Sequence, residues 1–150
     1  MSLYTGDCLE YLKTIKEPIF DLVITSPPYN IGRNYNYYSD NKDNYIDWLI
    51  EVFNEVCRCL KSNGHLFLNL SSTKNDPYAA YKIAEGINWK LQNNIIWCKA
   101  VEIDGYVRGY STPTSSKRYL QNGWEHLFHF TNDGNTEIDL ESSGVPYNTD

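Results

Sequence analysis

Apolar runs and amphipathic stretches alternate along most of this chain. Short apolar runs bounded by turn residues are typical of strands, and apolar residues recurring every three or four positions are typical of helices. The predicted strands are residues 3–5, 20–25, 65–71, 91–99 and 124–131. The predicted helices are residues 8–15, 45–61 and 77–87. The longest helix has the clearest pattern, because Leu49, Phe53 and Val56 fall on one face.

The ends of these helices carry recognisable signals. Asp7 precedes the first helix and is a good N-cap, since its carboxylate can accept from free backbone N–H groups. Asn63-Gly64 predicts a left-handed cap at the end of the second helix. Asp76 followed by Pro77 predicts the start of the third.

Strands alternating with helices as far as residue 99 predict an α/β fold of the doubly wound type. The strand at residues 20–25 is apolar at nearly every position, as expected where both faces of a parallel sheet are covered. Residues 30–44 and 100–122 are polar and predict long loops, and no clear element follows Gly134.

Size, composition and charge limit the classes of function that this chain can have. A chain of 150 residues with 41% hydrophobic residues is one globular domain. The net charge of −6 argues against nucleic acid at first sight, but residues 132–150 hold five acidic residues and no basic one. In residues 99–119 the balance is reversed, and binding to DNA requires a locally basic surface.

The cysteines and histidines do not predict a metal site. The four cysteines lack zinc-site spacing, and His126 and His129 lie three apart on a strand, which places them on opposite faces. We found no secretory signal and no apolar run long enough to span a membrane. The sequence therefore predicts a cytoplasmic protein with reduced thiols.

The strongest chemical candidate follows the strand at residues 20–25. Ser26-Pro27-Pro28-Tyr29 ends that strand, because neither proline can donate to a sheet. Ligands bind beyond the carboxyl ends of strands in open α/β sheets. A hydroxyl, rigid carbonyls and a flat ring would suit a planar ligand with an amino group. By itself, the same tetrapeptide also fits a plain rigid turn.

Residues 21–30 (DLVITSPPYN) resemble motif IV of the DNA N4-cytosine and N6-adenine methyltransferases, and residues 6–10 (GDCLE) resemble their motif III. The resemblance continues through residues 60–66, 95–99, 116–119 and 124–130, and it extends to residues 144–147. The motif order matches the permuted class called beta. The resemblance implies a Rossmann-like, S-adenosylmethionine-dependent methyltransferase sheet.

The resemblance also implies roles for individual residues. Ser26 and the Pro27 carbonyl would accept the hydrogens of the target amino group, Pro28 would stiffen the turn, and Tyr29 would stack on a base flipped out of double-stranded DNA. Asp7, with Cys8 beside it, would face the adenine end of the cofactor. We therefore expect the catalytic region at residues 1–131 and the start of a target-recognition or linker segment at 132–150.

Five further residues are candidate DNA contacts. Asn30 and Arg33 would form a lid near the target base, and Arg108, Lys117 and Arg118 would contact phosphates or a base. A mobile surface loop and solvated loop charges are the competing interpretations.

One family feature is missing from the 150 residues. The glycine-rich cofactor motif, of the form Phe-x-Gly-x-Gly, is absent, and Gly105 and Gly109 lack its spacing. In the beta class that motif lies near the C-terminus, and two central strands go with it. We therefore expect a fragment or one half of a split enzyme, with an exposed sheet edge and a second chain or segment supplying the motif.

Serine at the first position of motif IV favours cytosine N4 as the methylated atom, with adenine N6 as the alternative. Two other classes stay open. One is a non-catalytic DNA-binding fragment, and the other is methylation of an amine or amide in RNA or protein.

Overall fold

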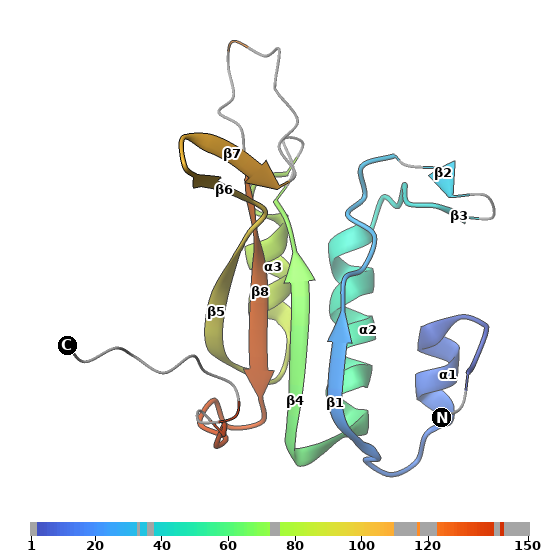
Figure 1. Cartoon of the computed structure of the whole chain (residues 1–150). Coiled ribbons are helices and arrows are strands. Elements are labelled where there is room, and N and C mark those ends of the chain that lie inside the picture. Colours follow the sequence, from blue (N-terminus) through green and yellow to red (C-terminus); the bar gives the residue numbers. More distant parts are fainter. Residues whose placement is uncertain are drawn as a thin grey trace.

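The computed structural model describes residues 3–32, 34–35, 38–72, 76–109, 117, 123–139 and 142. Its main sheet has four strands in the order β1-β4-β8-β5 (Figure 1). These strands are β1 (Phe20–Thr25), β4 (Leu60–Leu70), β8 (Trp124–Thr131) and β5 (Lys90–Cys98). Two small hairpins accompany the sheet: β2 (Asn34–Tyr35) with β3 (Tyr38–Ser39), and β6 (Ala100–Ile103) with β7 (Tyr106–Gly109). The α/β prediction is confirmed.

The sheet mixes parallel and antiparallel pairs. β1 and β4 are parallel, with Thr25 opposite Leu68, whereas β8 lies antiparallel to both β4 and β5. The carboxyl ends of β1 and β4 therefore lie beside the amino end of β8, at one end of the sheet. Figure 1 shows both small hairpins near that end.

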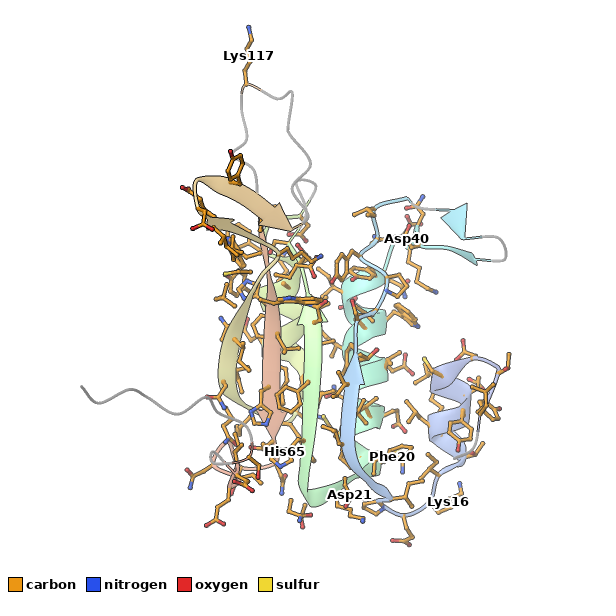
Figure 2. The ribbon with its side chains drawn as sticks, in the orientation of Figure 1. Lys16, Phe20, Asp21, Asp40, His65 and Lys117 are labelled. Carbon is orange, nitrogen blue, oxygen red and sulfur yellow. The ribbon has the colours of Figure 1, made fainter. Side chains whose placement is uncertain are left out.

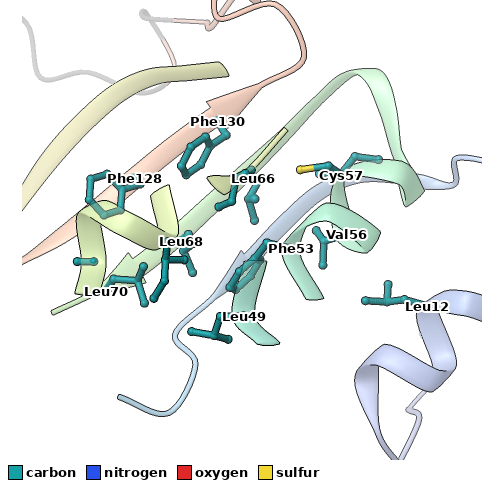
Figure 3. Packing of buried hydrophobic residues seen from close by; sticks show 14 of the residues in the cluster. Leu12, Leu49, Phe53, Val56, Cys57, Leu66, Leu68, Leu70, Phe128 and Phe130 are labelled. Atoms are coloured by element: carbon teal, nitrogen blue, oxygen red, sulfur yellow. The ribbon is translucent and has the colours of Figure 1, made fainter. Parts of the chain in front are cut away.

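One face of the sheet packs against helices. α2 (Tyr45–Cys59) and α3 (Ala79–Gly86) lie on it, and α1 (Cys8–Thr14) stands beside α2 (Figure 1). Figure 3 shows the core between these helices and the sheet. Its largest contributions come from Leu49, Phe53, Val56, Leu66, Leu68, Leu70, Phe128 and Phe130. α2 gives its apolar stripe to this core, as its sequence pattern predicted.

The opposite face carries no helix in the part of the chain that the structure describes. We call it the open face, and we call the helix-covered side the closed face. Leu22 and Ile24 of β1 are more than half-exposed, and so is Trp97 of β5. β1 is also an edge strand. An apolar parallel strand at an open edge is unusual for a complete sheet, because such strands are normally buried on both sides.

The predicted strand at residues 3–5 is wrong. These residues form no strand, and Leu3 is 94% exposed. A strand needs a hydrogen-bonding neighbour, and β1 pairs only with β4 among the described strands. Instead, the ring of Tyr4 packs on Tyr11 of α1, with ring centres 4.0 Å apart.

The predicted end of the second helix is also wrong. α2 stops at Cys59, and β4 begins at Leu60 and runs through the expected Asn63-Gly64 cap. Gly64 lies close to its neighbours, since an added Cβ would be 3.0 Å from the Lys61 carbonyl oxygen and 3.2 Å from that of Asp21. The glycine thus permits close strand pairing, not a left-handed turn.

The other differences concern element boundaries and loops. α3 begins at Ala79, two residues after the predicted start, although Asp76 still accepts from the backbone N–H of Tyr78. Both predicted loops contain a hairpin. The turn between β6 and β7 has positive φ at Asp104 and Gly105, which is the backbone of a type I′ turn.

His129 predicts a loss of stability in acid. It is fully buried on β8, with Nε2 3.0 Å from Nδ1 of His65 and Nδ1 3.0 Å from the Asn93 amide. Burial, and secondarily the nearby His65, lower the pKa of His129 below its ordinary 6.5. The unfolded chain therefore binds a proton at this histidine more readily than the folded chain does. The contribution of His129 to the free energy of unfolding is complete above about pH 6.5 and is lost as the pH falls below that value.

We expect the denaturant concentration at the unfolding midpoint to decrease from pH 7 to pH 5, and to decrease less in His129→Gln. His126 would leave part of the dependence, because burial lowers its pKa too. An unchanged pH dependence in the variant would contradict this origin.

Candidate active site

The segment after β1 lies where the carboxyl ends of β1 and β4 come together. Ser26 is exposed, whereas Pro27, Pro28 and Tyr29 are half-buried. The prolines end the strand, and the hydroxyl of Tyr29 lies within hydrogen-bonding distance of Asn69 on β4 and Glu125 on β8. The tetrapeptide is therefore fixed at this end of the sheet by its last residue.

The hydroxyl of Tyr29 is the centre of a compact set of hydrogen bonds. Its oxygen lies 3.0 Å from Oδ1 of Asn69 and 3.3 Å from Oε2 of Glu125, the two acceptors within reach of its one proton, and 3.1 Å from Oγ of Ser26. Asn69 and Glu125 are both more than nine-tenths buried. Lys99 donates to the other oxygen of Glu125 at 2.5 Å, so the carboxylate is paired.

The phenol of Tyr29 remains protonated at neutral pH. Burial raises its pKa to about 12, with the negative charge of Glu125 adding to the rise and the Ser26 hydrogen bond opposing it. Tyr29 therefore acts here as a hydrogen-bond donor and as a fixed aromatic ring, not as a base.

Neighbouring backbone groups are partly committed to the fold. The hydroxyl of Tyr45 donates to the Pro28 carbonyl at 2.7 Å. Asn30 has a left-handed backbone, and its amide makes two hydrogen bonds with the backbone of Lys42. Asn30 thus joins the segment after β1 to the start of α2, and its expected contact with DNA stays a prediction.

Two clefts meet at Ser26. One, of about 660 Å³, lies on the open face and is lined by residues of β1 and β5, including Ile24, Ile96 and Trp97. The other, of about 480 Å³, lies between α1, β1 and α2, and is lined by Cys8, Ser26, Pro27 and Pro28 among others. The second cleft brings together residues from the two sequence motifs.

The two expected cofactor residues lie at the start of α1. Cys8 is exposed and lines the cleft beside Ser26. Asp7 is the N-cap of α1, because its Oδ1 accepts from the backbone N–H groups of Leu9 and Glu10. Asp7 therefore has a structural role, and its second carboxylate oxygen remains suited to accept from a ligand.

The N-cap role predicts a measurable loss of stability. Asp7→Ala should lower the free energy of unfolding by about 1 kcal/mol, because two backbone N–H groups lose their acceptor. Asp7→Ser keeps an acceptor and should lose much less. Urea denaturation would compare the two, and equal losses would rule out capping as the cause.

The expected DNA contacts are only partly placed. Lys117 is exposed and projects far beyond the end of the sheet in Figure 2, at the same end of the molecule as the site. Arg108 belongs to β7 opposite Val101, but its side chain lies outside the described residues. Arg33 and Arg118 also lie outside them.

Sequence reasoning missed three residues of the site, namely Asn69, Lys99 and Glu125. The first and last are polar residues inside apolar runs that were correctly predicted as strands. A polar residue in a buried strand must find a partner, so this signal was available. The partner itself could not be identified, because Glu125 and Tyr29 are 96 residues apart.

Among the described residues, no group of three or more His, Cys, Asp or Glu side chains could hold a metal ion. Likewise, no described helix is long and apolar enough to cross a membrane.

A family model described as DNA methylase, of the N6 and N4 type, matches residues 20–150. The chain belongs to this family. The Escherichia coli K12 DNA adenine methyltransferase YhdJ is 35% identical over 94 residues, covering 61% of this chain and 31% of that protein. The type II methyltransferase M.SfiI of Streptomyces fimbriatus is 27% identical, covering 99% of this chain and 40% of that protein. The chain thus spans less than half the length of either relative.

Solved structures support the same fold. The PvuII DNA methyltransferase, described as cytosine-N4-specific, matches 95% of this chain and 54% of its own, with a TM-score of 0.68 at 20% identity. A protein from Thermus thermophilus, described as a DNA modification methylase and solved with S-adenosyl-L-methionine, matches 94% of this chain and 58% of its own, with a TM-score of 0.60 at 22% identity. The family resemblance and the partial methyltransferase fold are therefore confirmed.

Proposed function

We propose that this chain forms the amine-binding half of a DNA methyltransferase that modifies N4 of cytosine. The observation that carries the proposal is the set of hydrogen bonds that fixes Tyr29 and Ser26 at the carboxyl ends of β1 and β4. Family membership supports DNA amino-methylation, and serine at position 26 favours cytosine over adenine.

On the base side of the reaction, each residue of the tetrapeptide has a proposed role. Ser26 Oγ and the Pro27 carbonyl accept the two hydrogens of the amino group, which increases the lone-pair character of its nitrogen. The Pro28 carbonyl is already bonded to Tyr45, which leaves that of Pro27 for the ligand. The Tyr29 ring, anchored through its hydroxyl, stacks on the extruded base.

The methyl donor is S-adenosyl-L-methionine, the cofactor of this family. The start of α1 suits its adenosine part, since the Asp7 carboxylate can accept from a polar hydrogen and the adjacent cleft is mainly apolar. When bound, the cofactor supplies an electrophilic methyl group. We propose that the glycine-rich motif comes from a further segment or a second chain lying along the open edge of β1.

Double-stranded DNA is the proposed substrate. The sequence carries Arg33, Arg108, Lys117 and Arg118 in the polar segments 30–44 and 100–122, and their positive charge offsets the acidic overall balance. Asn30 holds the segment leading from Tyr29 to α2.

The test is to identify the modified nucleoside. The complete protein would be incubated with plasmid DNA and methyl-labelled S-adenosyl-L-methionine, and the DNA digested to nucleosides for mass spectrometry. We expect label in N4-methylcytosine. Label in N6-methyladenine would correct the base, label in protein or RNA would correct the substrate class, and no label would contradict methyltransferase activity.

A further inference from the structure

The hydrogen bonds around Tyr29 have fixed directions. The NH₂ group of Asn69 donates to the backbone carbonyl of His126 at 2.9 Å, so Oδ1 of Asn69 faces Tyr29 as an acceptor. The Glu125 carboxylate can only accept, and it already accepts from Lys99. Whichever of these two acceptors Tyr29 uses, its single hydroxyl proton points toward them and away from Ser26.

Ser26 must therefore be the donor in its bond with Tyr29. The two oxygens are 3.1 Å apart, and the only proton available for that bond is the one on Ser26. A serine hydroxyl that donates its proton in this way retains lone pairs and has no second proton to offer. Because Ser26 is exposed to the two clefts, these lone pairs are accessible to a ligand.

We propose that Asn69 and Glu125 are positioning residues which, through Tyr29, hold Ser26 as an obligate hydrogen-bond acceptor, so that the site selects bases carrying an amino group over bases carrying a carbonyl there. The proposal rests on the proposed function, since it concerns the same site. Lys99 contributes by holding the Glu125 carboxylate in place through an ion pair.

The chemical consequence is discrimination between otherwise similar rings. Cytosine presents an amino donor at ring position 4, where uracil presents a carbonyl acceptor, and adenine differs from hypoxanthine in the same way at position 6. An amino group can donate a hydrogen bond to the Ser26 oxygen. A carbonyl oxygen at the same position would place two acceptors opposite each other with no proton between them. One such mismatch costs about tenfold in binding.

The experiment measures nucleoside binding to this chain by ligand-observed saturation-transfer NMR, which detects weak binding. The pairs are 2′-deoxycytidine with 2′-deoxyuridine, and 2′-deoxyadenosine with 2′-deoxyinosine. We expect the amino nucleoside of at least one pair to bind about tenfold more tightly. Tyr29→Phe keeps the ring but frees the Ser26 hydroxyl to rotate, so the preference should fall to about twofold or less.

Glu125→Gln should lower the preference only partly, because Asn69 still accepts from Tyr29. Glu102→Gln, which changes an exposed carboxylate on β6, is the matched control and should leave the preference unchanged. A purely structural role for Glu125 would weaken both members of a pair equally. Circular dichroism would verify that each variant is folded.

Equal binding within both pairs, an unchanged preference in Tyr29→Phe, or no binding of any nucleoside would each overturn the proposal. These outcomes can be distinguished from failure of the proposed function. If the protein methylates DNA but its preference survives Tyr29→Phe, the role of Tyr29 in orienting Ser26 is wrong and the proposed function stands. If the site is selective but the protein transfers no methyl group, the orienting role stands and the proposed function is wrong.

Discussion

Leu68→Ala should lower the free energy of unfolding of this chain by about 3 kcal/mol. Leu68 is fully buried near the carboxyl end of β4, where it packs between the sheet and the helices on the closed face (Figure 3). Removing its isobutyl group costs both the transfer free energy and the cavity left behind, and buried leucines typically lose 2–5 kcal/mol on such truncation, so about 3 kcal/mol is a central value. Urea denaturation followed by circular dichroism would measure the change.

Leu22→Ala provides the matched comparison, because it is the same substitution on the neighbouring strand. Leu22 lies on the open face and is 51% exposed, so the expected loss is below about 1 kcal/mol. Similar losses at both positions would contradict the assignment of one closed and one open face. A large loss at Leu22 only in the presence of a partner segment would show that this segment covers the open face.

The strongly patterned parts of the fold could be predicted from sequence. β1, α2 and β8 have clear periodicity or continuous apolar runs, and their existence and type are confirmed. The errors occurred where tertiary context decides. Residues 3–5 look like a strand but have no pairing partner among the described residues, and Gly64 looks like a helix cap but serves strand pairing.

One missed element did have a sequence signal. Asp104-Gly105 between Val101-Glu102-Ile103 and Tyr106-Val107 is the Asp-Gly pattern of a type I′ hairpin, and both residues have positive φ. The polar composition of the surrounding residues 100–122 masked this local pattern. The short β2–β3 hairpin has no such signal.

The position of the candidate site could be predicted from the sequence, but the residues that hold Tyr29 in it could not. Its chain position followed from the strand end and the family motif, and the structure brings Ser26 and Cys8 to one cleft. The residues that hold Tyr29 could not be predicted, because Asn69 and Glu125 meet it only after β1, β4 and β8 are aligned in the sheet. Long-range pairing of this kind is a property of the register, which no local pattern contains.

Ser26→Ala should reduce kcat/KM for DNA methylation by the complete protein about a hundredfold. The alanine removes the oxygen that accepts from the target amino group, and losing one preorganised hydrogen bond at a reacting centre costs about 10²–10³ in rate. The fold should be little affected, since Ser26 is exposed and makes only the bond to Tyr29 among those described. Initial rates of labelled methyl transfer would measure the effect.

Two comparisons sharpen that test. Ser62→Ala, an exposed position at the opposite end of the sheet on β4, should leave the rate unchanged. Ser26→Thr keeps a hydroxyl and should retain far more activity than Ser26→Ala. Methylation that persisted undiminished in Ser26→Ala would refute the assignment of Ser26 as the amine acceptor. A loss of equal size in Ser26→Thr would instead show that shape at this position matters more than the hydroxyl, because threonine supplies the same lone pairs with one additional methyl group.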